Sequence, residues 1–329
     1  MDAFLAITGH VAAGGTSRAA GRRAGPAPAE RGAGAGGMAR TIREQQRARR
    51  ADRPPTPQEA EVGNPLGQEA PEVVDAGARV GAQRLGRPAA GDAITAFIGG
   101  MSVRFGAVAM AWAAASSGGA PAPSPAHLAG ALAFPVGFLV LLVGKSELFT
   151  ENFFLPVTAV LERRGTVGQL AALWAVTLAL NLLGGLTFAL LITRPGVLDG
   201  GPARYLVALA EHSVQYPFST AFVKAIFAGW LMTLLTWLLL AARGLGPRLA
   251  IIWAVAALIV LGQFNHAIIS AAEIFIAMLL GARIGVADWL TRNLLPALLG
   301  NVVGGVLFVT LLFYVQAQLH RPAGDAAGR

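Results

Sequence analysis

Long apolar stretches dominate the chain from about residue 92 onward, and they limit the possible folds more than any other feature. Stretches of twenty or more apolar residues alternate with short polar loops over residues 92–318. A transmembrane α-helix needs about 20 consecutive apolar residues, so this pattern predicts an all-α membrane protein. The composition agrees, because only 13% of the residues are charged, against roughly 25% in a soluble domain.

Six membrane spans follow from the hydropathy pattern. Their expected bounds are Asp92–Ala115, His127–Leu161, Gly168–Ile192, Phe218–Ala242, Pro247–Leu280 and Trp289–Gln318. An even number of spans places both chain termini on the same side of the membrane. The basic segments 162–165 and 243–248 share that side. By the positive-inside rule we expect it to face the cytoplasm.

Two of these spans are too long and have polar centres. The second covers about 35 residues and contains GKSELFTEN, and the fifth covers about 34 and contains GQFNHAIIS. In one continuous helix Glu147 and Glu151 would lie at positions i and i+4, where like charges repel. We therefore predict that both helices are interrupted. Non-helical backbone is tolerated at membrane depth only inside protein or beside a water-filled cavity, so the two breaks are expected to line a pore.

The third and sixth spans contain an internal repeat. NLLGGLTF at residues 181–188 matches NVVGGVLF at residues 301–308, with Asn181 and Asn301 in the same place. Each copy follows an interrupted span at a similar distance, so we interpret the chain as two homologous halves of three helices, the second inverted. Interrupted helices at matching positions of inverted repeats indicate a transport path. The two asparagines either pack helices together or contact the transported solute, and we favour packing.

The first 88 residues differ from the rest of the chain. They hold 13 of the 26 Lys and Arg residues, and they are rich in Gly, Ala and Pro. Such a composition cannot build a core. We therefore expect a disordered cytoplasmic arm over residues 1–88, a channel domain over residues 89–318 and a short cytoplasmic tail over residues 319–329. Residues 71–86 are a candidate interfacial helix.

Several kinds of partner and chemistry are not expected. The run ARTIREQQRARRADR at residues 39–53 is basic enough for nucleic acid or anionic lipid, but we interpret it as part of a solvated arm and expect no nucleic-acid partner. The chain has no cysteine, which excludes disulfides and thiolate metal sites. We expect no metal, no cofactor and no enzyme activity, since GxSxG and HExxH motifs are absent from the sequence.

Three segments carry a family resemblance. SELFTEN (146–152), FNHAIIS (264–270) and GNVVGG (300–305) resemble, in the same order, the signature segments of the formate/nitrite transporter family. The resemblance extends over about residues 92–316. It implies an aquaporin-like protomer of six helices, assembled as a homopentamer with one pore per protomer in a bacterial inner membrane. The permeants it implies are small monovalent anions such as formate, nitrite or hydrosulfide, in some members together with a proton.

The resemblance also implies roles for single residues. Leu148, Phe149 and Thr150 match the family's loop in the broken second helix, and His266 matches the central histidine of the broken fifth helix. Phe134 matches a phenylalanine that narrows the cytoplasmic side of the pore. In the sixth helix, the family's asparagine is matched by Asn301.

Several positions depart from the family pattern. The second constriction, usually Phe, falls at Ile259, and an asparagine common in the fourth helix is replaced by Gly229. Lys145 and Glu151 stand where small residues are usual. We expect selectivity to differ from that of the relatives at Lys145 and Glu151.

Ionisable residues inside a membrane suggest a function. We expect His266 to give a hydrogen bond or a proton to a passing anion, with its tautomer set by Gln263 and Asn265. Thr150 and the N–H groups of its loop are expected to hold the anion. Lys145 and Glu147 are expected to form a charge pair that steadies the loop, because an unpaired charge there would be costly. Glu273 is a candidate proton partner or loop anchor.

Taken together, these observations predict a passive or proton-coupled channel for small monovalent anions or their conjugate acids. Three alternatives remain open. One is a pore of the same fold for neutral solutes, because Glu147 and Glu151 would discourage anions. The others are an intramembrane enzyme that uses His266 and Glu273, and a non-conducting sensor that acts through the basic arm.

Overall fold

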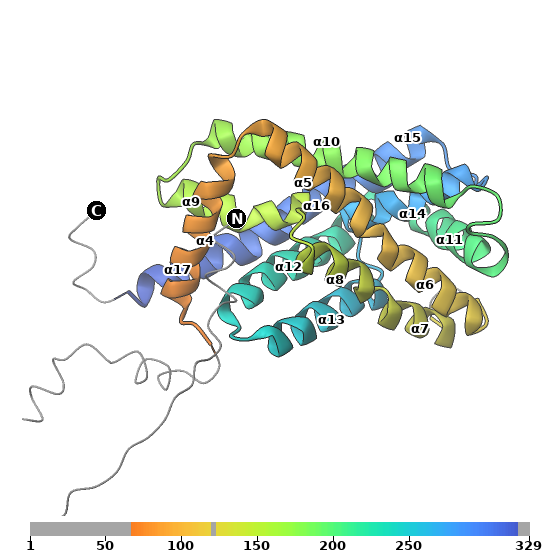
Figure 1. Ribbon diagram of the computed structural model, residues 1–329, viewed down its shortest axis with the longest axis horizontal. Coiled ribbons are helices and arrows are strands. Elements are labelled where there is room, and N and C mark those ends of the chain that lie inside the picture. Colours follow the sequence, from red (N-terminus) through yellow and green to blue (C-terminus); the bar gives the residue numbers. More distant parts are fainter. Residues whose placement is uncertain (1–66, 120–122, 322–329) are drawn as a thin grey trace, which may run out of the picture. The chain divides into compact units, whose positions relative to one another are not determined.

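A computed structural model of the protein describes residues 67–119 and 123–321, and this part is all-helical (Figure 1). The predicted all-α membrane fold is confirmed. Four of the six expected spans are uninterrupted over a length that can cross a bilayer. The first span, Ala89–Ser116, contains α5 (Ala89–Ser102) and α6 (Arg104–Ser116). The third is α10 (Val167–Ile192), the fourth is α12 (Phe218–Ala241) and the sixth is Val286–Leu319.

The second and fifth spans are broken, as the polar centres predict. The second consists of α7 (Pro125–Ala133), α8 (Pro135–Val143), a 3-10 turn η1 (Phe149–Phe153) and α9 (Leu155–Leu161). The fifth consists of α13 (Leu245–Leu261) and α14 (Ala267–Leu279). Lys145 and Gln263 occupy the left-handed region, with φ of 58° and 49°. A positive φ is uncommon for residues other than glycine. In both breaks the backbone therefore leaves the helix through one residue in this conformation.

Asn181 and Asn301 clamp these breaks. The side-chain oxygen of Asn181 accepts from the backbone N–H of Phe149 (2.8 Å), and its amide donates to the carbonyls of Ala96 (2.7 Å) and Glu147 (3.0 Å). A buried backbone group without a partner is costly, and here an asparagine from another helix supplies the partner.

Asn301 repeats this pattern in the second half. Its oxygen accepts from the N–H of Ala267 (2.9 Å), and its amide donates to the carbonyls of Ala225 (2.8 Å) and Asn265 (3.0 Å). Both asparagines are fully buried, and both side chains bind backbone only. The geometry therefore favours packing over contact with the solute, and the two halves build the same clamp. The inversion of the second half stays a prediction.

The structure explains why glycine occupies position 229, one of the departures from the family pattern. A Cβ at position 229 would lie 2.2 Å from the carbonyl oxygen of Asn301, and one at Gly100 would lie 2.3 Å from that of Asn181. Each glycine lets the first helix of its half approach its clamping asparagine. The absent side chain at 229 is thus part of the clamp.

The domain boundary differs from the predicted one. Residues 70–85 form helix α4, and Val73, Val74 and Ala78 on it are fully buried. The packed domain therefore begins near residue 67, so the predicted boundary at residue 89 is corrected, and α4 lies against α9 and α17 (Leu312–Leu319). Residues 1–66, with the basic run 39–53, and residues 322–329 lie outside the described part of the chain.

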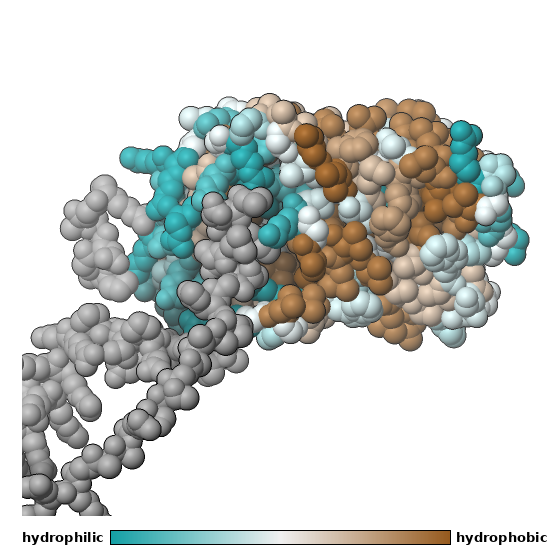
Figure 2. Space-filling view, in the orientation of Figure 1, coloured by the Kyte–Doolittle hydropathy of each residue, from teal (hydrophilic) through white to brown (hydrophobic). Residues whose placement is uncertain are grey.

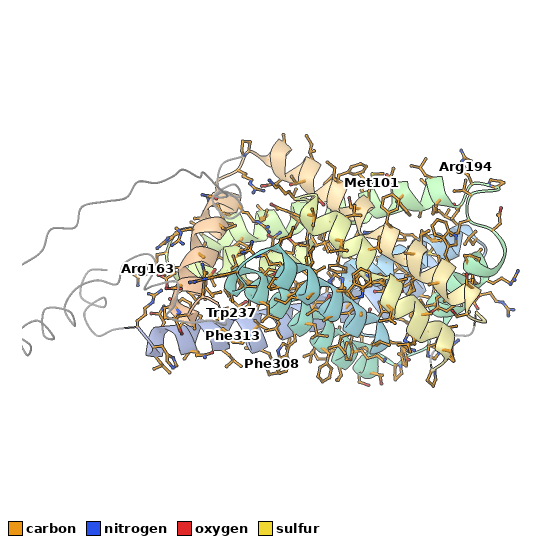
Figure 3. The ribbon with its side chains drawn as sticks, turned by 60° about the horizontal axis from the view of Figure 1, so that its bottom comes forward. Met101, Arg163, Arg194, Trp237, Phe308 and Phe313 are labelled. Atoms are coloured by element: carbon orange, nitrogen blue, oxygen red, sulfur yellow. The ribbon has the colours of Figure 1, made fainter. Side chains whose placement is uncertain are left out.

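The loops gather at two ends of the helical domain. At one end Gln68 bonds to the carbonyl of Ala241, and Arg321 bridges Asp75 and Glu162. The basic segments predicted to share a side therefore meet there. At the other end α11 (Gly200–Ser213), which sequence analysis left unassigned, packs on α14. Figure 3 shows Arg163 and Arg194 at opposite ends of α10. In Figure 2 hydrophobic residues cover much of the surface between the hydrophilic ends.

The clamp predicts a large effect for one substitution. Asn301→Ala removes the partner of three backbone groups, two of them in fully buried bonds, and each loss at a buried group costs about 1–3 kcal/mol. We expect the free energy of unfolding of the purified protein to fall by at least about 2 kcal/mol. Thr187→Ala, which removes only a bond to the same helix, is the control. Equal thermal unfolding of the two variants would contradict the clamp.

Candidate functional site

The two broken helices meet at a hydrogen bond between Thr150 and His266. Thr150 lies in η1 and His266 immediately precedes α14. The side-chain oxygen of Thr150 is 2.9 Å from Nε2 of His266, and both residues are fully buried. Sequence analysis singled out each residue without placing them in contact. The structure brings them together from positions 116 residues apart in the chain.

The backbone of α14 sets the tautomer of His266. Its Nδ1 accepts from the N–H groups of Ile268 and Ile269, both at 3.2 Å. An accepting Nδ1 carries no proton, so the imidazole proton sits on Nε2 and is donated to Thr150. The hydroxyl of Thr150 is then left free to donate its own hydrogen to a third group. Two donors in series form a polarised chain, in which each bond strengthens the next.

Gln263 and Asn265 do not set this tautomer, so that expectation is corrected. The side-chain oxygen of Gln263 accepts from the Tyr216 hydroxyl (3.1 Å). Asn265 binds Ser270 (3.0 Å) and Asn293 (3.1 Å) through its side-chain oxygen. The loop polar groups therefore hold the loop itself, while the histidine serves as the N-terminal cap of α14.

The apolar candidate residues are buried in one hydrophobic cluster. Phe134 lies at the junction of α7 and α8, is fully buried and packs against Phe138, with 5.8 Å between ring centroids. Leu148 and Ile259 are buried in the same apolar cluster. Phe149 packs edge-on against Trp174 of α10, at 6.1 Å between centroids. Narrowing of the pore by Phe134 and Ile259 stays a prediction, as does the place of Leu148 and Phe149 in its lining.

The carboxylates of the first break have a partner that sequence analysis missed. Arg84, at the end of α4, lies 3.3 Å from Glu147 and 3.6 Å from Glu151, and it donates to Asn152 at 2.8 Å. Arg87 also pairs with Glu147. Lys145, the expected partner of Glu147, is exposed. Glu147 is thus held by two arginines from residues that were assigned to a disordered arm, and the pairing of Lys145 with Glu147 stays a prediction.

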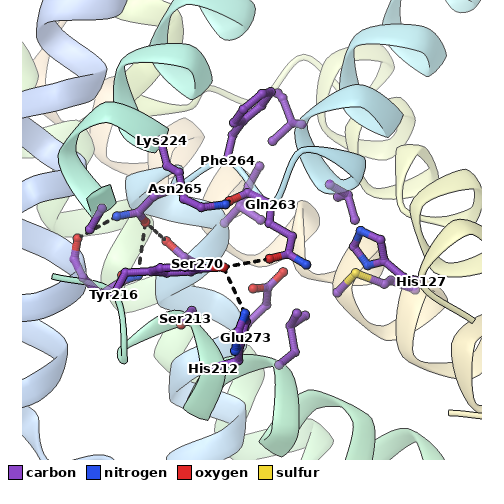
Figure 4. Close-up of a pocket in the computed structure, with 17 residues that line it drawn as sticks. His127, His212, Ser213, Tyr216, Lys224, Gln263, Phe264, Asn265, Ser270 and Glu273 are labelled. Atoms are coloured by element: carbon purple, nitrogen blue, oxygen red, sulfur yellow. Dashed lines mark hydrogen bonds between the residues drawn. The ribbon is translucent and has the colours of Figure 1, made fainter. Parts of the chain in front are cut away.

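A cavity of about 60 Å³ lies at the second break (Figure 4). Lys224 of α12 lies in its wall and donates to the carbonyls of Gly262 (3.3 Å) and Gln263 (3.2 Å), so it holds that loop much as Arg84 holds the first. Glu273 and Ile259 also line the cavity. Lys224 and Tyr216 were not singled out from the sequence, because a lysine near a helix end is commonly an interfacial residue.

Comparisons with known proteins agree with this architecture. The profile of a protein family described as formate/nitrite transporter matches residues 71–315. The uncharacterized transporter YrhG of Bacillus subtilis is 27% identical over 74% of this chain and 91% of its own length. The formate channel FocA of Escherichia coli K12 is 28% identical over 58% of this chain and 74% of its own length. A solved pentameric formate channel with formate bound has a TM-score of 0.60 at 24% identity, covering 70% of this chain and 98% of that one.

The ion pairs of Arg84 predict a conditional loss of stability. Arg84→Met leaves two buried carboxylates without their shared partner, which we expect to cost roughly 3 kcal/mol of unfolding free energy. Adding Glu147→Gln and Glu151→Gln to that variant removes the unpaired charges and should recover part of the loss. Arg79→Met, at an exposed position of the same helix, is the matched control. If the triple variant unfolds as readily as Arg84→Met, the pairing is not what stabilises the loop.

Proposed function

Because the chain belongs to the formate/nitrite transporter family, we propose that it is a membrane channel for small monovalent anions or their conjugate acids, with formate and nitrite as first candidates. The observation that carries this proposal is the hydrogen bond between Thr150 and His266, which joins the two interrupted helices in the apolar interior. The relatives reported above are named as transporters or channels, and a role as an enzyme is not proposed.

The donor chain from His266 to Thr150 suits a small anion. A charged solute that leaves water for an apolar passage loses its hydration, which is costly unless new hydrogen bonds replace it. The Thr150 hydroxyl, polarised by His266, offers such a bond to an anion oxygen. His266 acts as a donor that stays neutral, because protonating Nδ1 would release both backbone N–H groups of α14. Any proton that travels with the anion is then carried by the anion, as its conjugate acid.

The charges of the first break favour an anion path over a pore for neutral solutes. That alternative rested on Glu147 and Glu151 discouraging anions. Both carboxylates are paired with Arg84, and Glu147 also with Arg87. The second break adds Lys224 in the cavity wall. The acidic residues are thus compensated, and the basis for excluding anions is removed.

The proposal includes an assembly and a topology. The chain is a multi-pass membrane protein, and we propose a homopentamer in a bacterial inner membrane with both termini in the cytoplasm. Support comes from the related pentameric channel and from the basic segments that meet at one end. The helices also expose large apolar side chains, such as Leu190, Phe227 and Leu299, which lipid or a neighbouring protomer would cover.

Loss of the Thr150 hydroxyl tests the donor chain. In proteoliposomes we expect Thr150→Val to lower formate flux by roughly tenfold or more, since a hydrogen bond to a charged group contributes about 1.5–3 kcal/mol. His266→Ala should have a similar effect, and Thr150→Ser should retain most of the flux. Thr158→Val is the matched control, because this buried hydroxyl binds only its own helix. Wild-type flux in Thr150→Val would refute the role of the hydroxyl.

Native mass spectrometry tests the assembly. We expect the purified full-length protein, released gently from detergent, to carry the mass of five chains. A species of a single chain that conducts formate after reconstitution would show that the pore needs no neighbour and would contradict the proposed pentamer.

A further inference from the structure

Helix α6 holds a buried arginine that has no hydrogen-bond partner in the described part of the chain. Arg104 begins α6 and is fully buried. None of its three guanidinium nitrogens makes a hydrogen bond within the described part of the chain. A buried charge that is neither paired nor hydrogen-bonded is costly. An arginine that served packing alone would be expected to have its N–H groups satisfied.

The position of the guanidinium depends on Gly185. A Cβ at residue 185 would lie 1.9 Å from Nη2 and 2.4 Å from Cζ of Arg104. The guanidinium therefore lies against the bare backbone of α10, one helical turn after the clamping Asn181. The glycine of the repeated motif makes room for the charge.

The second half of the chain holds a neutral residue at the matching place. Gly184 packs against the carbonyl of Phe97 and Gly304 against that of Ile226. Seven residues further along each helix, from 97 to 104 and from 226 to 233, stand Arg104 and Thr233. A Cβ at Gly305 would lie 2.4 Å from the Thr233 hydroxyl. The fold thus needs only a small hydroxyl at this position, and the arginine is an addition of the first half.

Helices α11 and α14 pack against α6 and carry titratable groups. Arg104 interacts electrostatically with His266 and with Glu273 of α14, which lines the cavity. No carboxylate of the described residues lies within ion-pair distance of it. Tyr205 of α11 is buried and its hydroxyl has no hydrogen-bond partner there. Burial, and to a lesser extent Glu273, raises the pKa of Tyr205 to about 12, so its hydroxyl stays a donor.

We propose that Arg104 binds the permeating anion, on the stretch of path between the Thr150–His266 pair and the cavity. The inference rests on the proposed anion conduction and names the class of anion: small monovalent anions with two coplanar oxygens, such as a carboxylate or nitrite. A guanidinium donates two parallel N–H bonds to such a group, which a point charge cannot do. Glu273 supplies the counter-charge when no anion is present, and the anion takes over that role when it arrives.

Three substitutions separate the charge of Arg104 from its shape. Arg104→Lys keeps the charge and removes the fork of N–H donors. Arg104→Thr copies Thr233 of the second half. Gly185→Ala leaves the arginine in place and displaces its guanidinium. The control is Arg194→Lys at the exposed end of α10. Flux of formate, nitrite and hydrosulfide is measured in proteoliposomes of the full chain, after each variant is shown to be monodisperse with wild-type thermal unfolding.

The inference predicts a change in selectivity. Arg104→Lys and Gly185→Ala should lower formate and nitrite flux by roughly tenfold, while hydrosulfide, which binds through one atom, changes by less than about threefold. Arg104→Thr should lower the flux of all three anions. If Arg104→Thr does not fold, the fluxes of Arg104→Lys and Gly185→Ala alone test the inference.

Two outcomes would overturn the inference and leave the proposed function standing. One is formate flux at the wild-type level in Arg104→Lys and Gly185→Ala. The other is an equal loss of formate and hydrosulfide flux in these two variants, because it would show that the fork does not contact the anion. A wild-type protein that passes none of the three anions would instead overturn the proposed function, and this inference with it.

Discussion

The fold depends on satisfying backbone polar groups where two helices are interrupted inside the membrane. The hydrocarbon of the bilayer offers no hydrogen-bond partner, so each unpaired N–H or C=O would cost several kcal/mol. Asn181 and Asn301 meet this demand with three hydrogen bonds each. The glycines that face them allow the approach. Without these clamps the two breaks would have no stable backbone conformation, and no functional group on them would have a fixed position.

The clamps determine what the two breaks can present. The first break presents the hydroxyl of Thr150, and the second presents His266, whose Nδ1 is committed to the backbone of α14. Their contact leaves a polarised hydroxyl in the buried interior, where we propose that it meets the anion. Basic side chains from outside each break, Arg84 for the first and Lys224 for the second, hold the loops and set the local charge. In the proposed channel, the same groups that support the loops would also attract an anion.

Sequence reasoning reached the breaks, the asparagine pair and the two central residues, because each leaves a local trace. Polar residues amid a long apolar run reveal an interrupted helix, and a repeated NxxGG motif reveals the clamp. The roles of Arg84 and Arg104 could not be predicted from the sequence. Arg84 belongs to a segment whose composition resembles a disordered arm, and its contacts with Glu147 span 60 or more residues. Arg104 is one charge in an ordinary apolar run, and its significance depends on Gly185 of another helix.

The tautomer of His266 and its contact with Thr150 could be assigned only from the structure. The sequence neighbours Gln263 and Asn265 were expected to set the tautomer, and they bind other groups. The central claim is that this geometry serves anions. Flux of the unmodified protein in proteoliposomes tests it most directly, with formate, nitrite, acetate, lactate and the neutral solute urea measured at two pH values. The account predicts passage of the small anions, faster at the lower pH where the conjugate acid is more abundant, and exclusion of urea. Passage of urea with no dependence on pH or solute charge, or no flux of any anion, would contradict it.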